Sequence, residues 1–586
     1  MSLLCGFAVG LGAVVPSEST TASADSPQPA GLVTSLDALT PRTLGRETRP
    51  CLPTGQAQLP LAVPPQTVLR FGFGVAGEAW RNGLEQVELT AELVADGEKT
   101  TLWRQTLAAG DEAWHDVEVP LDRVAGRRGT LTLGHRTLRG TATPDHLVHW
   151  TNPSLGPVTR RGGPNIVLVS IDTLRADHLR CYGYERDTSP NIDRLAREGV
   201  LFRQAISPSS WTLPSHASML TGLDPSHHGA MRFGNRTPLS RDHQTVAERL
   251  WDNGYATAGL TGGGFVAASF GFDQGFNRYW SENVLGSLDD ELAANIDRAL
   301  DWIATLDDRP FFLFLHTYAV HAPYSPPAET NIFVDPSYEG RFKTTFTSRE
   351  QPTYALGVHD FDAPTLHHIE ALYDAGIRHV DEVLGRLIAA LERRGDTCLL
   401  VTSDHGEEFN EHGHILHRQP KLYEELVRVP LIVWCPSRYG GGRVIDQPVS
   451  TVDVTPTLLE IAGVPLPAGL DGISLEPTLA GRPQKFREVI VSEVSRSLIG
   501  KPGAVRAVRT GSQKLIVSEP DGAAQLFDLA DDPGETRDVR SEHPESTARL
   551  TELLDAALGQ KPRVVVGRAR PDQATLDRLR ALGYTQ

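Results

Sequence analysis

The sequence NIVLVSID, residues 165–172, decides the expected fold. Its apolar, β-branched run is short, as is typical of a strand that is buried on both faces of a parallel sheet. The run ends at Asp172. Because open α/β sheets bind their ligands at the carboxyl ends of the strands, Asp172 is a candidate metal ligand. Taken alone, an acid in this position is more often the cap of a turn or helix.

A second strand of the same kind lies far downstream, in CLLVTSDHGEE at residues 398–408. Its apolar part leads into Asp404 and His405, two side chains that bind metal ions. Parallel strands of one sheet end at the same edge, so these two residues are expected beside Asp172.

The third informative stretch is WTLPSHASMLTG, residues 211–222, which places the hydroxyl of Thr212 at the start of a helix-capable run. The N-terminus of a helix stabilises both an anion and a developing alkoxide. The alternative is that Thr212 is only the N-cap of this helix. Together with Asp172, Asp404 and His405, it predicts a one-metal site. A cation there lowers the pKa of the hydroxyl and so generates a nucleophile.

Six stretches from about residue 164 onward carry a family resemblance: NIVLVSIDTLRADHLRCYGY, SPNIDRLAREGVLF, S-x-W-T-x-P-S-x-x-S-x-L-T-G, PFFLFLHTYAVHAPYSPP, SDHGEEFNEHG and YEELVRVPLIV. Near the C-terminus, QLFDLADDPGETRDV and LDRLRALGYTQ add to it. With these stretches the chain resembles the sulfatase family of the alkaline-phosphatase superfamily. The resemblance implies an α/β fold, with an alkaline-phosphatase-like, mostly parallel sheet, helices on both faces and a small C-terminal antiparallel subdomain. It also implies a metal-dependent ester hydrolase.

Four positions depart from the family pattern. Sulfatases carry a Cys or Ser, later oxidised to formylglycine, where this chain has Thr212, and an Arg where it has His216. Threonine should not give that aldehyde. Many sulfatases also have a metal-binding Asp at the position of Thr173 and a Lys at that of His417. An imidazole there can bind a metal or donate a proton near neutral pH.

These departures favour chemistry at phosphorus over chemistry at sulfur. Superfamily members that use an unmodified Thr are mostly phosphodiesterases, phosphomonoesterases and phospho-group transferases. The resemblance therefore implies hydrolysis or transfer of a phosphate or sulfate ester through a Thr nucleophile, with the phosphoester or phosphodiester slightly favoured. The alternative reaction is that of an ester-sulfate hydrolase. A catalytically degenerate glycan-binding protein is the alternative from another class, and the retention of all four presumed metal ligands argues against it.

The family match also implies a role for each candidate site residue. The expected metal ligands are Asp172, Thr212, Asp404 and His405. The expected catalytic residues are Thr212 and three histidines that bind the substrate anion or act as an acid, namely His216, His321 and His417. Oxygen and imidazole donors admit one divalent ion, Zn²⁺ or Mn²⁺ readily and Ca²⁺ less so, and they leave room for a second.

Four further histidines lie close to these motifs. His316 follows an apolar strand and is interpreted as a core histidine. His228 is interpreted as structural. For His412 and His414 two interpretations stay open, an exposed loop or the shell of a second metal ion.

The size and charge of the chain exclude some classes of protein. Its 586 residues are too many for one core and predict several domains. A net charge of −17 argues against binding to nucleic acid or to anionic membranes. The family resemblance implies a small-molecule, glycan or lipid ester as the partner. Five scattered cysteines give no disulfide framework, and Cys398 and Cys435 are expected as buried thiols. The oligomeric state stays open.

The N-terminal part divides into three expected segments. Residues 1–24 are a candidate signal peptide, because their apolar run is too short to span a bilayer well. A signal peptide predicts export, either to the periplasm or the extracellular space or as a lipid-anchored protein. Residues 25–57 are an expected linker. Short alternating strands over residues 58–157 predict a jelly-roll-like β-sandwich. It is either a carbohydrate-binding module or, as preferred here, a structural cap.

The remaining chain divides into two expected segments. Strands alternate with helices over residues 164–480, the sulfatase-like catalytic domain. Within it, residues 326–364 are longer than an ordinary loop and could shape the substrate pocket. Residues 481–586 are the expected C-terminal subdomain, with a small antiparallel sheet and a helix over residues 573–582.

Overall fold

The structure is a computed structural model that describes most of the chain between residues 40 and 584. The described ranges are 40–44, 47–53, 55–142, 144–151, 153–157, 162–231, 237–281, 288–306, 308–347, 361–417, 419–499, 501–559, 569, 571, 573–582 and 584. The candidate signal peptide and residues 25–39 of the expected linker lie outside these ranges. So do residues 348–360 of the predicted excursion.

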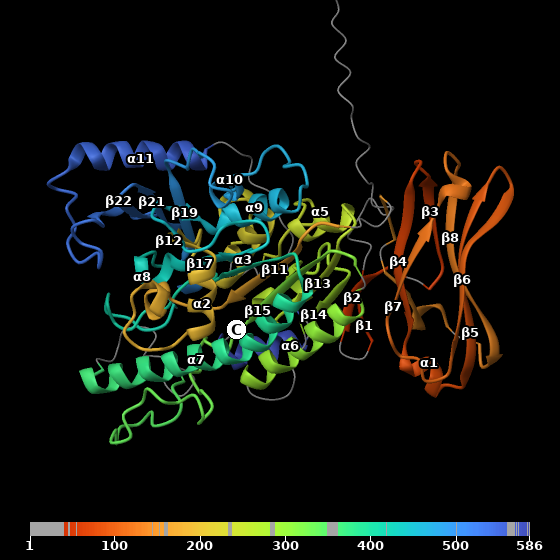
Figure 1. The fold of residues 1–586 in the computed structure, drawn as a ribbon, viewed down its shortest axis with the longest axis horizontal. Helices are drawn as coiled ribbons and strands as arrows, with labels where there is room; N and C mark the ends of the chain where they lie inside the picture. The colour runs from red at the N-terminus through yellow and green to blue at the C-terminus, as the bar shows by residue number, and fades with distance from the viewer. Residues whose placement is uncertain are drawn as a thin grey trace, which may run out of the picture.

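A mixed, mostly parallel sheet forms the centre of the larger part of the molecule (Figure 1). Its strand order is β1-β2-β14-β13-β15-β11-β16-β17-β12-β18, and β19 also pairs with β12. The strands are β1 Thr40–Leu44, β2 Glu47–Cys51, β11 Asn165–Ile171, β12 Val200–Ile206, β13 Ala256–Leu260, β14 Arg278–Trp280, β15 Phe311–Thr317, β16 Thr397–Thr402, β17 Arg428–Trp434, β18 Arg443–Ile445 and β19 Val449–Ser450. This arrangement confirms the predicted fold class.

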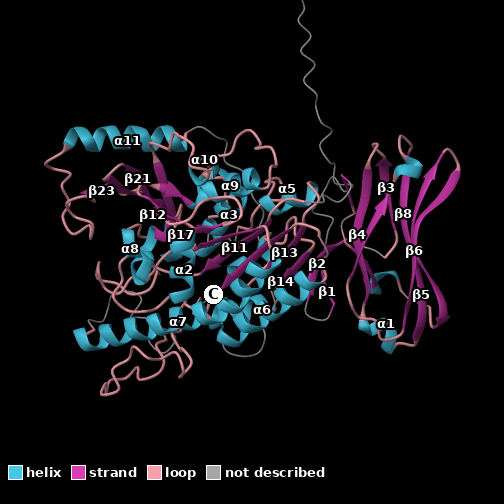
Figure 2. Ribbon diagram, viewed as in Figure 1, coloured by secondary structure: helices cyan, strands magenta, loops and turns pink. Residues whose placement is uncertain are grey.

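Helices cover both faces of this sheet, as Figure 2 shows. One face carries α2 Pro190–Glu198, α6 Leu288–Ala304 and α7 Ala363–Arg394. The other carries α3 Thr212–Thr221, α5 Val246–Asp252 and α9 Val454–Ile461. Shorter helices are α1 Gly77–Arg81, α4 Pro225–His228, α8 Glu424–Val427 and α10 Glu476–Leu479.

Strand β11 shows why the central strands are apolar throughout. Ile166 and Leu168 pack into the core on one face of the sheet, whereas Val167 and Val169 pack into the core on the other. Successive side chains of a strand point to opposite faces, so an unbroken apolar run serves both cores. Strand β11 pairs in parallel with β15 and β16, so the carboxyl ends of all three strands lie at one edge.

Strand β17 runs antiparallel to both of its neighbours, β16 and β12. Its direction places Cys435 beside Cys398, and their Cα atoms are 4.3 Å apart. The two residues form a disulfide in the structure, so the prediction of two buried thiols is corrected. The spacing of the cysteines along the chain could not show this pairing, because it depends on which strands become neighbours.

Two antiparallel sheets precede the catalytic segment and share one hydrophobic core. The first contains β3 Ala57–Ala62, β8 Arg128–Gly140, β5 Leu84–Ala95 and β6 Glu98–Ala108. The second contains β10 Ser154–Pro157, β4 Thr67–Val75, β7 His115–Pro120 and β9 Val148–Trp150. Phe71 and Phe73 contact the rings of Trp103 and Trp150 in this core. Two facing sheets around an aromatic core agree with a sandwich.

The structure differs from the expected linker over residues 25–57. Strands β1 and β2 form an antiparallel hairpin within that range, and Thr48 of β2 pairs with Tyr279 of β14. The hairpin therefore extends one edge of the main sheet (Figure 1). Local composition suggested a linker because the partner strand lies more than two hundred residues away.

The C-terminal part contains the small antiparallel sheet that the sequence predicts. Its strands are β20 Ile490–Ser495, β21 Ala504–Thr510, β22 Gln513–Ser518 and β23 Ala523–Asp528. Helix α11, Pro544–Leu558, packs Leu550 and Leu554 against this sheet. Helix α12, Gln573–Ala581, instead returns to the main domain, where Leu579 and Leu582 join its core. Among the described residues, no helix has both the length and the apolar character needed to cross a membrane.

Candidate active site

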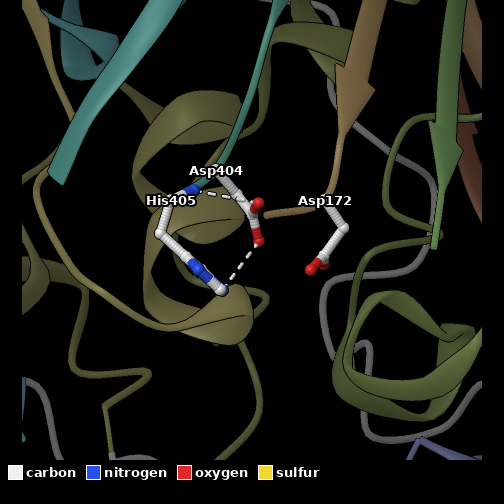
Figure 3. A group of neighbouring side chains, drawn as sticks. All are labelled: Asp172, Asp404 and His405. Carbon is white, nitrogen blue, oxygen red and sulfur yellow. Dashed lines mark hydrogen bonds and ion pairs between the residues drawn. The ribbon is translucent and has the colours of Figure 1, made fainter. Parts of the chain in front are cut away.

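Three predicted metal ligands meet at the carboxyl edge of the main sheet, just beyond strands β11 and β16. These strands are parallel neighbours, so Asp172 at the end of one lies beside Asp404 and His405 at the end of the other. One ligand atom from each residue lies within 4.8 Å of the other two. All three side chains are buried and point toward a common centre (Figure 3).

Backbone groups hold the carboxylate of Asp404 in place. Its Oδ1 accepts hydrogen bonds from the N–H groups of Thr173, at 3.3 Å, and His405, at 2.9 Å. Its Oδ2 and the Oδ1 of Asp172 accept no hydrogen bond from the described residues. Burial raises the pKa of Asp172, and the Asp404 carboxylate raises it further. Buried, facing carboxylate oxygens of this kind are costly alone and fit a bound cation.

The imidazole of His405 is oriented to present a lone pair. Its Nδ1–H donates to the carbonyl oxygen of Gly406 at 2.9 Å, which leaves Nε2 as the acceptor nitrogen. Nε2 lies 3.4 Å from Oδ2 of Asp404 and 3.4 Å from the hydroxyl of Thr212. Two carboxylates, an imidazole and a hydroxyl are a donor set that suits Zn²⁺ or Mn²⁺.

Thr212 occupies the first turn of α3 and its side chain is fully buried. The N-cap residue is Trp211, which makes no side-chain capping bond, so the structure does not support Thr212 as a simple cap. The Thr212 hydroxyl faces His405, and its interaction with Asp172 lowers the pKa of that carboxyl against the larger effect of burial. The hydroxyl therefore lies among the three candidate ligands.

Thr173, one of the four positions that depart from the family pattern, orients the backbone beside Asp404. Its φ is 60°, a left-handed conformation that is uncommon for a β-branched residue. Its hydroxyl donates to the carbonyl oxygen of Asp172 at 2.7 Å, and its own carbonyl accepts from Tyr373 of α7 at 2.7 Å. This turn aims the Thr173 N–H at Asp404, so the backbone orients a ligand in place of a further carboxylate.

His216 lies one helical turn after Thr212, and both of its ring nitrogens have protein partners. Nδ1 is 2.9 Å from the carbonyl oxygen of Thr212, and Nε2 is 2.9 Å from the hydroxyl of Ser170 on β11. Burial lowers the pKa of His216, which favours the neutral ring. The residue therefore connects α3 to β11 just behind the candidate nucleophile.

His316, interpreted from the sequence as a core histidine, is buried but lies within the site. Its Nδ1 accepts from the N–H of Gly262 at 3.3 Å, and its Nε2 is 3.4 Å from Oδ2 of Asp172. Burial lowers the pKa of His316 well below its usual range. The neutral ring can thus donate from Nε2 to Asp172 and fix that carboxylate.

A second cluster adjoins the candidate ligands and contains His321 and His417. The rings of these histidines are 4.9 Å apart, and the ring of His417 is 4.5 Å from that of His405. Nδ1 of His417 is 2.7 Å from Oε1 of Glu407, whose Oε2 accepts from Tyr324 at 2.8 Å. Glu407 was not predicted from the sequence, although it follows His405 by two residues in the SDHGEE stretch.

The other candidate histidines lie in separate clusters. His228 contacts the hydroxyl of Ser218 and the N–H of Ala230, which agrees with a structural role. His412 pairs with Glu425 and His414 with Lys421. Glu408 lies with His412 and Glu425 in one group of neighbouring side chains, and Lys421 pairs with Glu408 at 2.8 Å. An ammonium group therefore already supplies a positive charge there. These contacts do not favour a second metal ion at His412 and His414.

The comparison with family profiles identifies the class of protein that this fold and site define. The sulfatase profile matches residues 164–464, and the profile of the C-terminal region of N-sulphoglucosamine sulphohydrolase matches residues 410–561. Because the first match spans more than half of the chain, the chain belongs to the sulfatase family. It is therefore a sulfatase-family hydrolase, and this family normally uses a divalent metal ion.

Particular relatives place the chain within that family. Arylsulfatase K of Bos taurus is 28% identical over 447 residues, which cover 67% of this chain and 81% of that protein. N-acetylglucosamine-6-O-sulfatase of Bacteroides thetaiotaomicron is 25% identical over 493 residues, covering 67% and 86%. The solved phosphonate monoester hydrolase of Agrobacterium radiobacter has a TM-score of 0.57 at 23% identity and covers 68% of this chain and 96% of its own. That structure shares the fold.

Proposed function

We propose that this chain cleaves a phosphate or sulfate ester by hydrolysis or group transfer, with Thr212 as the nucleophile. The observation that carries the proposal is the position of the Thr212 hydroxyl, which is buried 3.4 Å from His405 Nε2, the acceptor nitrogen that faces Asp404. Asp172, Asp404, His405 and Thr212 would hold one divalent cation, which lowers the pKa of a bound hydroxyl.

The surrounding residues support this role for Thr212. Its place in the first turn of α3 puts the positive end of the helix dipole beside the attacking oxygen. His216 holds α3 against β11 through Ser170, and we assign it a positioning role because both ring nitrogens are already engaged. His321 and His417 remain the histidines for substrate contact.

Phosphorus is slightly favoured as the reacting centre because the nucleophile is an unmodified threonine. Sulfatases use a formylglycine instead, together with an Arg at the position of His216. The nearby Arg175 does not replace that guanidinium, because it pairs with Asp177 and Glu411 and donates to the Glu407 carbonyl. One neighbour in fold acts on phosphonate monoesters.

Sulfate esters are the second candidate because several relatives are named for them. These relatives include arylsulfatases and an N-acetylglucosamine-6-O-sulfatase, and one neighbour in fold was solved with D-glucosamine-2-N,6-O-disulfate. A small ester or a sulfated glycan is the corresponding substrate class.

Export is the proposed localisation. The apolar run at residues 3–15 suits a signal peptide, and the bond between Cys398 and Cys435 suits an oxidising compartment.

A matched set of aryl esters tests the proposal. The purified chain is assayed with 4-nitrophenyl sulfate, 4-nitrophenyl phosphate and bis(4-nitrophenyl) phosphate, with and without Zn²⁺ and Mn²⁺. Thr212→Ala should lower kcat by at least about a thousandfold on the preferred ester, because the attacking oxygen is lost. Thr212→Ser should keep partial activity, since it retains the oxygen but loses the methyl group that restricts the rotamer.

Mass spectrometry of the quenched enzyme should find a phosphorylated or sulfated Thr212, which identifies the transferred group. Thr221→Ala, at the far end of α3, is the control and should keep full activity. Near-normal turnover by Thr212→Ala would show that the nucleophile lies elsewhere. Absence of turnover of every ester by the metal-loaded wild type would favour a binding protein.

A further inference from the structure

The hydroxyl of Tyr584 lies where the two candidate substrate histidines converge. It is 2.7 Å from Nε2 of His417 and 3.5 Å from Nε2 of His321. Tyr584 is 8% exposed, so the residue is part of the interior of the molecule. The Tyr584 oxygen thus lies between the two imidazoles, within hydrogen-bonding distance of both.

The tautomer of His417 makes the tyrosine the donor. Glu407 is buried and accepts the Nδ1–H of His417 at 2.7 Å, so Nε2 carries a lone pair toward Tyr584. The phenol O–H therefore donates to His417. An oxygen atom of a ligand that entered this position could accept the same hydrogen bond.

Packing fixes Tyr584 as part of the domain. Helix α12 places Arg578 in a buried ion pair with Glu291 of α6, and Arg578 Nε donates to the carbonyl oxygen of Gly262 at 2.9 Å. Leu582 lies in the main core, and the ring of Tyr584 contacts that of Phe265 at 4.9 Å. Buried pairs and core contacts of this kind hold the hydroxyl in one place.

The same helix also contacts the support of Asp172. Gly262, whose carbonyl accepts from Arg578, donates its own N–H to His316, and His316 reaches Asp172. Helix α12 is therefore connected to both parts of the site, to His417 through Tyr584 and to Asp172 through Gly262.

We infer that Tyr584 is a substrate-binding residue that donates a hydrogen bond to the oxygen that leaves from the ester. This inference rests on the proposed function, because it takes His321 and His417 as the residues on the leaving-group side. On binding, the ester oxygen enters between the histidines and accepts the bond that Tyr584 gives to His417 in the absence of substrate.

The transfer step balances without any further reactant. The bond from phosphorus or sulfur to the leaving oxygen breaks, and a bond to Thr212 Oγ1 forms. The leaving oxygen keeps the electron pair and ends with one proton, which balances the proton that Thr212 loses. Tyr584 keeps its own proton and stabilises the negative charge that develops on that oxygen.

Leaving groups of different basicity provide the test. The variant is Tyr584→Phe in the full chain, which removes one oxygen and keeps the ring against Phe265. Its kcat/KM is compared with that of the wild type on the 4-nitrophenyl and phenyl esters of whichever acid the wild type turns over. Arg580→Ala is the matched control, because Arg580 lies on the same helix with an exposed side chain.

The phenyl ester should lose about 100- to 1,000-fold in kcat/KM, the range for removal of one donor to developing negative charge. The 4-nitrophenyl ester, whose leaving oxygen needs little help, should lose a few-fold at most. Arg580→Ala should match the wild type on both. Inhibition by inorganic phosphate or sulfate should stay unchanged in Tyr584→Phe, because these anions lack a leaving group.

Equal losses on both esters would overturn the inference, since a structural role lowers all turnover alike. Unchanged or faster turnover of both esters would overturn it too. Weaker inhibition by the inorganic anion would place Tyr584 on the transferred group instead. These outcomes can be distinguished from the test of Thr212. The effect of Tyr584→Phe is read from the difference between the two esters, and this difference can be measured whichever residue is the nucleophile.

Discussion

The two ends of the described chain attach to the main sheet and its core in different ways. At the N-terminal end, strands β1 and β2 extend the sheet beyond β14, and ion pairs of Arg278 and Arg309 join the sandwich to the main domain. At the C-terminal end, helix α12 packs into the core and brings Tyr584 to His417. Within the described residues, only the second end touches the candidate site. The N-terminal attachment therefore supports the domain, whereas the C-terminal attachment adds a residue to the candidate site.

The largest expected effect comes from the site itself, with Asp404→Asn. Asparagine keeps the size of the side chain but removes the negative charge that faces Asp172, so a divalent ion should bind far more weakly. Both the bound metal, measured by elemental analysis, and kcat should fall together, the latter by about a thousandfold or more.

Asp396→Asn is the control for this variant, because Asp396 precedes strand β16 at the end opposite Asp404 and pairs there with Arg438. It should retain both metal and activity. Full metal content and normal turnover in Asp404→Asn would remove Asp404 from the metal site.

A smaller effect, on stability alone, is expected at the N-terminal attachment. Asp116 of β7 accepts from Arg49 at 2.5 Å and from Asn277 at 2.8 Å. Although burial raises the pKa of Asp116, Arg49 and Arg278 hold it below its usual value. Asp116→Asn should lower the free energy of unfolding by about 2 kcal/mol at pH 7 and leave kcat/KM unchanged.

The pH dependence of this difference has a defined sign. A carboxyl group with a lowered folded-state pKa stabilises the fold above its unfolded pKa, and that contribution is lost as pH falls through the folded value. The difference between wild type and Asp116→Asn, from denaturant unfolding, should therefore decline below about pH 4. A loss of kcat in a fully folded variant would show that the sandwich acts on the site.

The smallest expected effect is at Asp252, the last residue of α5, on the side of the domain where Trp251 contacts Ser154 of the sandwich. Burial, and then the nearby Glu248, raise the pKa of Asp252 to about 7. The folded state thus favours the protonated acid, and this contribution is lost as pH rises through 7. The free energy of unfolding of Asp252→Asn, relative to that of the wild type, should therefore rise by about 1 kcal/mol between pH 5 and pH 8, after allowance for partial exposure.

Thermal unfolding at the two pH values measures this gain, and the exposed Asp301→Asn serves as its control. A gain that does not change with pH would contradict the assignment of the titrating group. Either way, turnover should stay that of the wild type.

The sequence predicted the parts of the site that follow directly from strand pattern. An apolar run ends in Asp172, and another ends in Asp404 and His405. These candidate ligands meet because neighbouring parallel strands share an edge. The family resemblance supplied His321 and His417, which the structure places side by side. These features depend on short stretches of sequence, and short stretches were enough to find them.

The features that escaped prediction depend on contacts between distant segments. The position of Tyr584 beside His417 follows from the return of α12 to the core. The LDRLRALGYTQ stretch carried the family resemblance but did not indicate this contact. From the sequence, His316 could not be distinguished from a core histidine at the end of a strand, because its contact with Asp172 depends on the pairing of β15 with β11. The hairpin at residues 40–51 was missed for the same reason, since its partner strand is remote.

The disulfide between Cys398 and Cys435 has a consequence for the unfolded chain. The two cysteines are 37 residues apart, and the closed loop between them carries Asp404, His405 and His417. By the chain-entropy account, closing a loop of this length removes on the order of 4 kcal/mol of denatured-state entropy at room temperature. A denatured molecule that keeps this bond therefore retains one side of the candidate site as a tethered loop, which shortens the conformational search when it refolds.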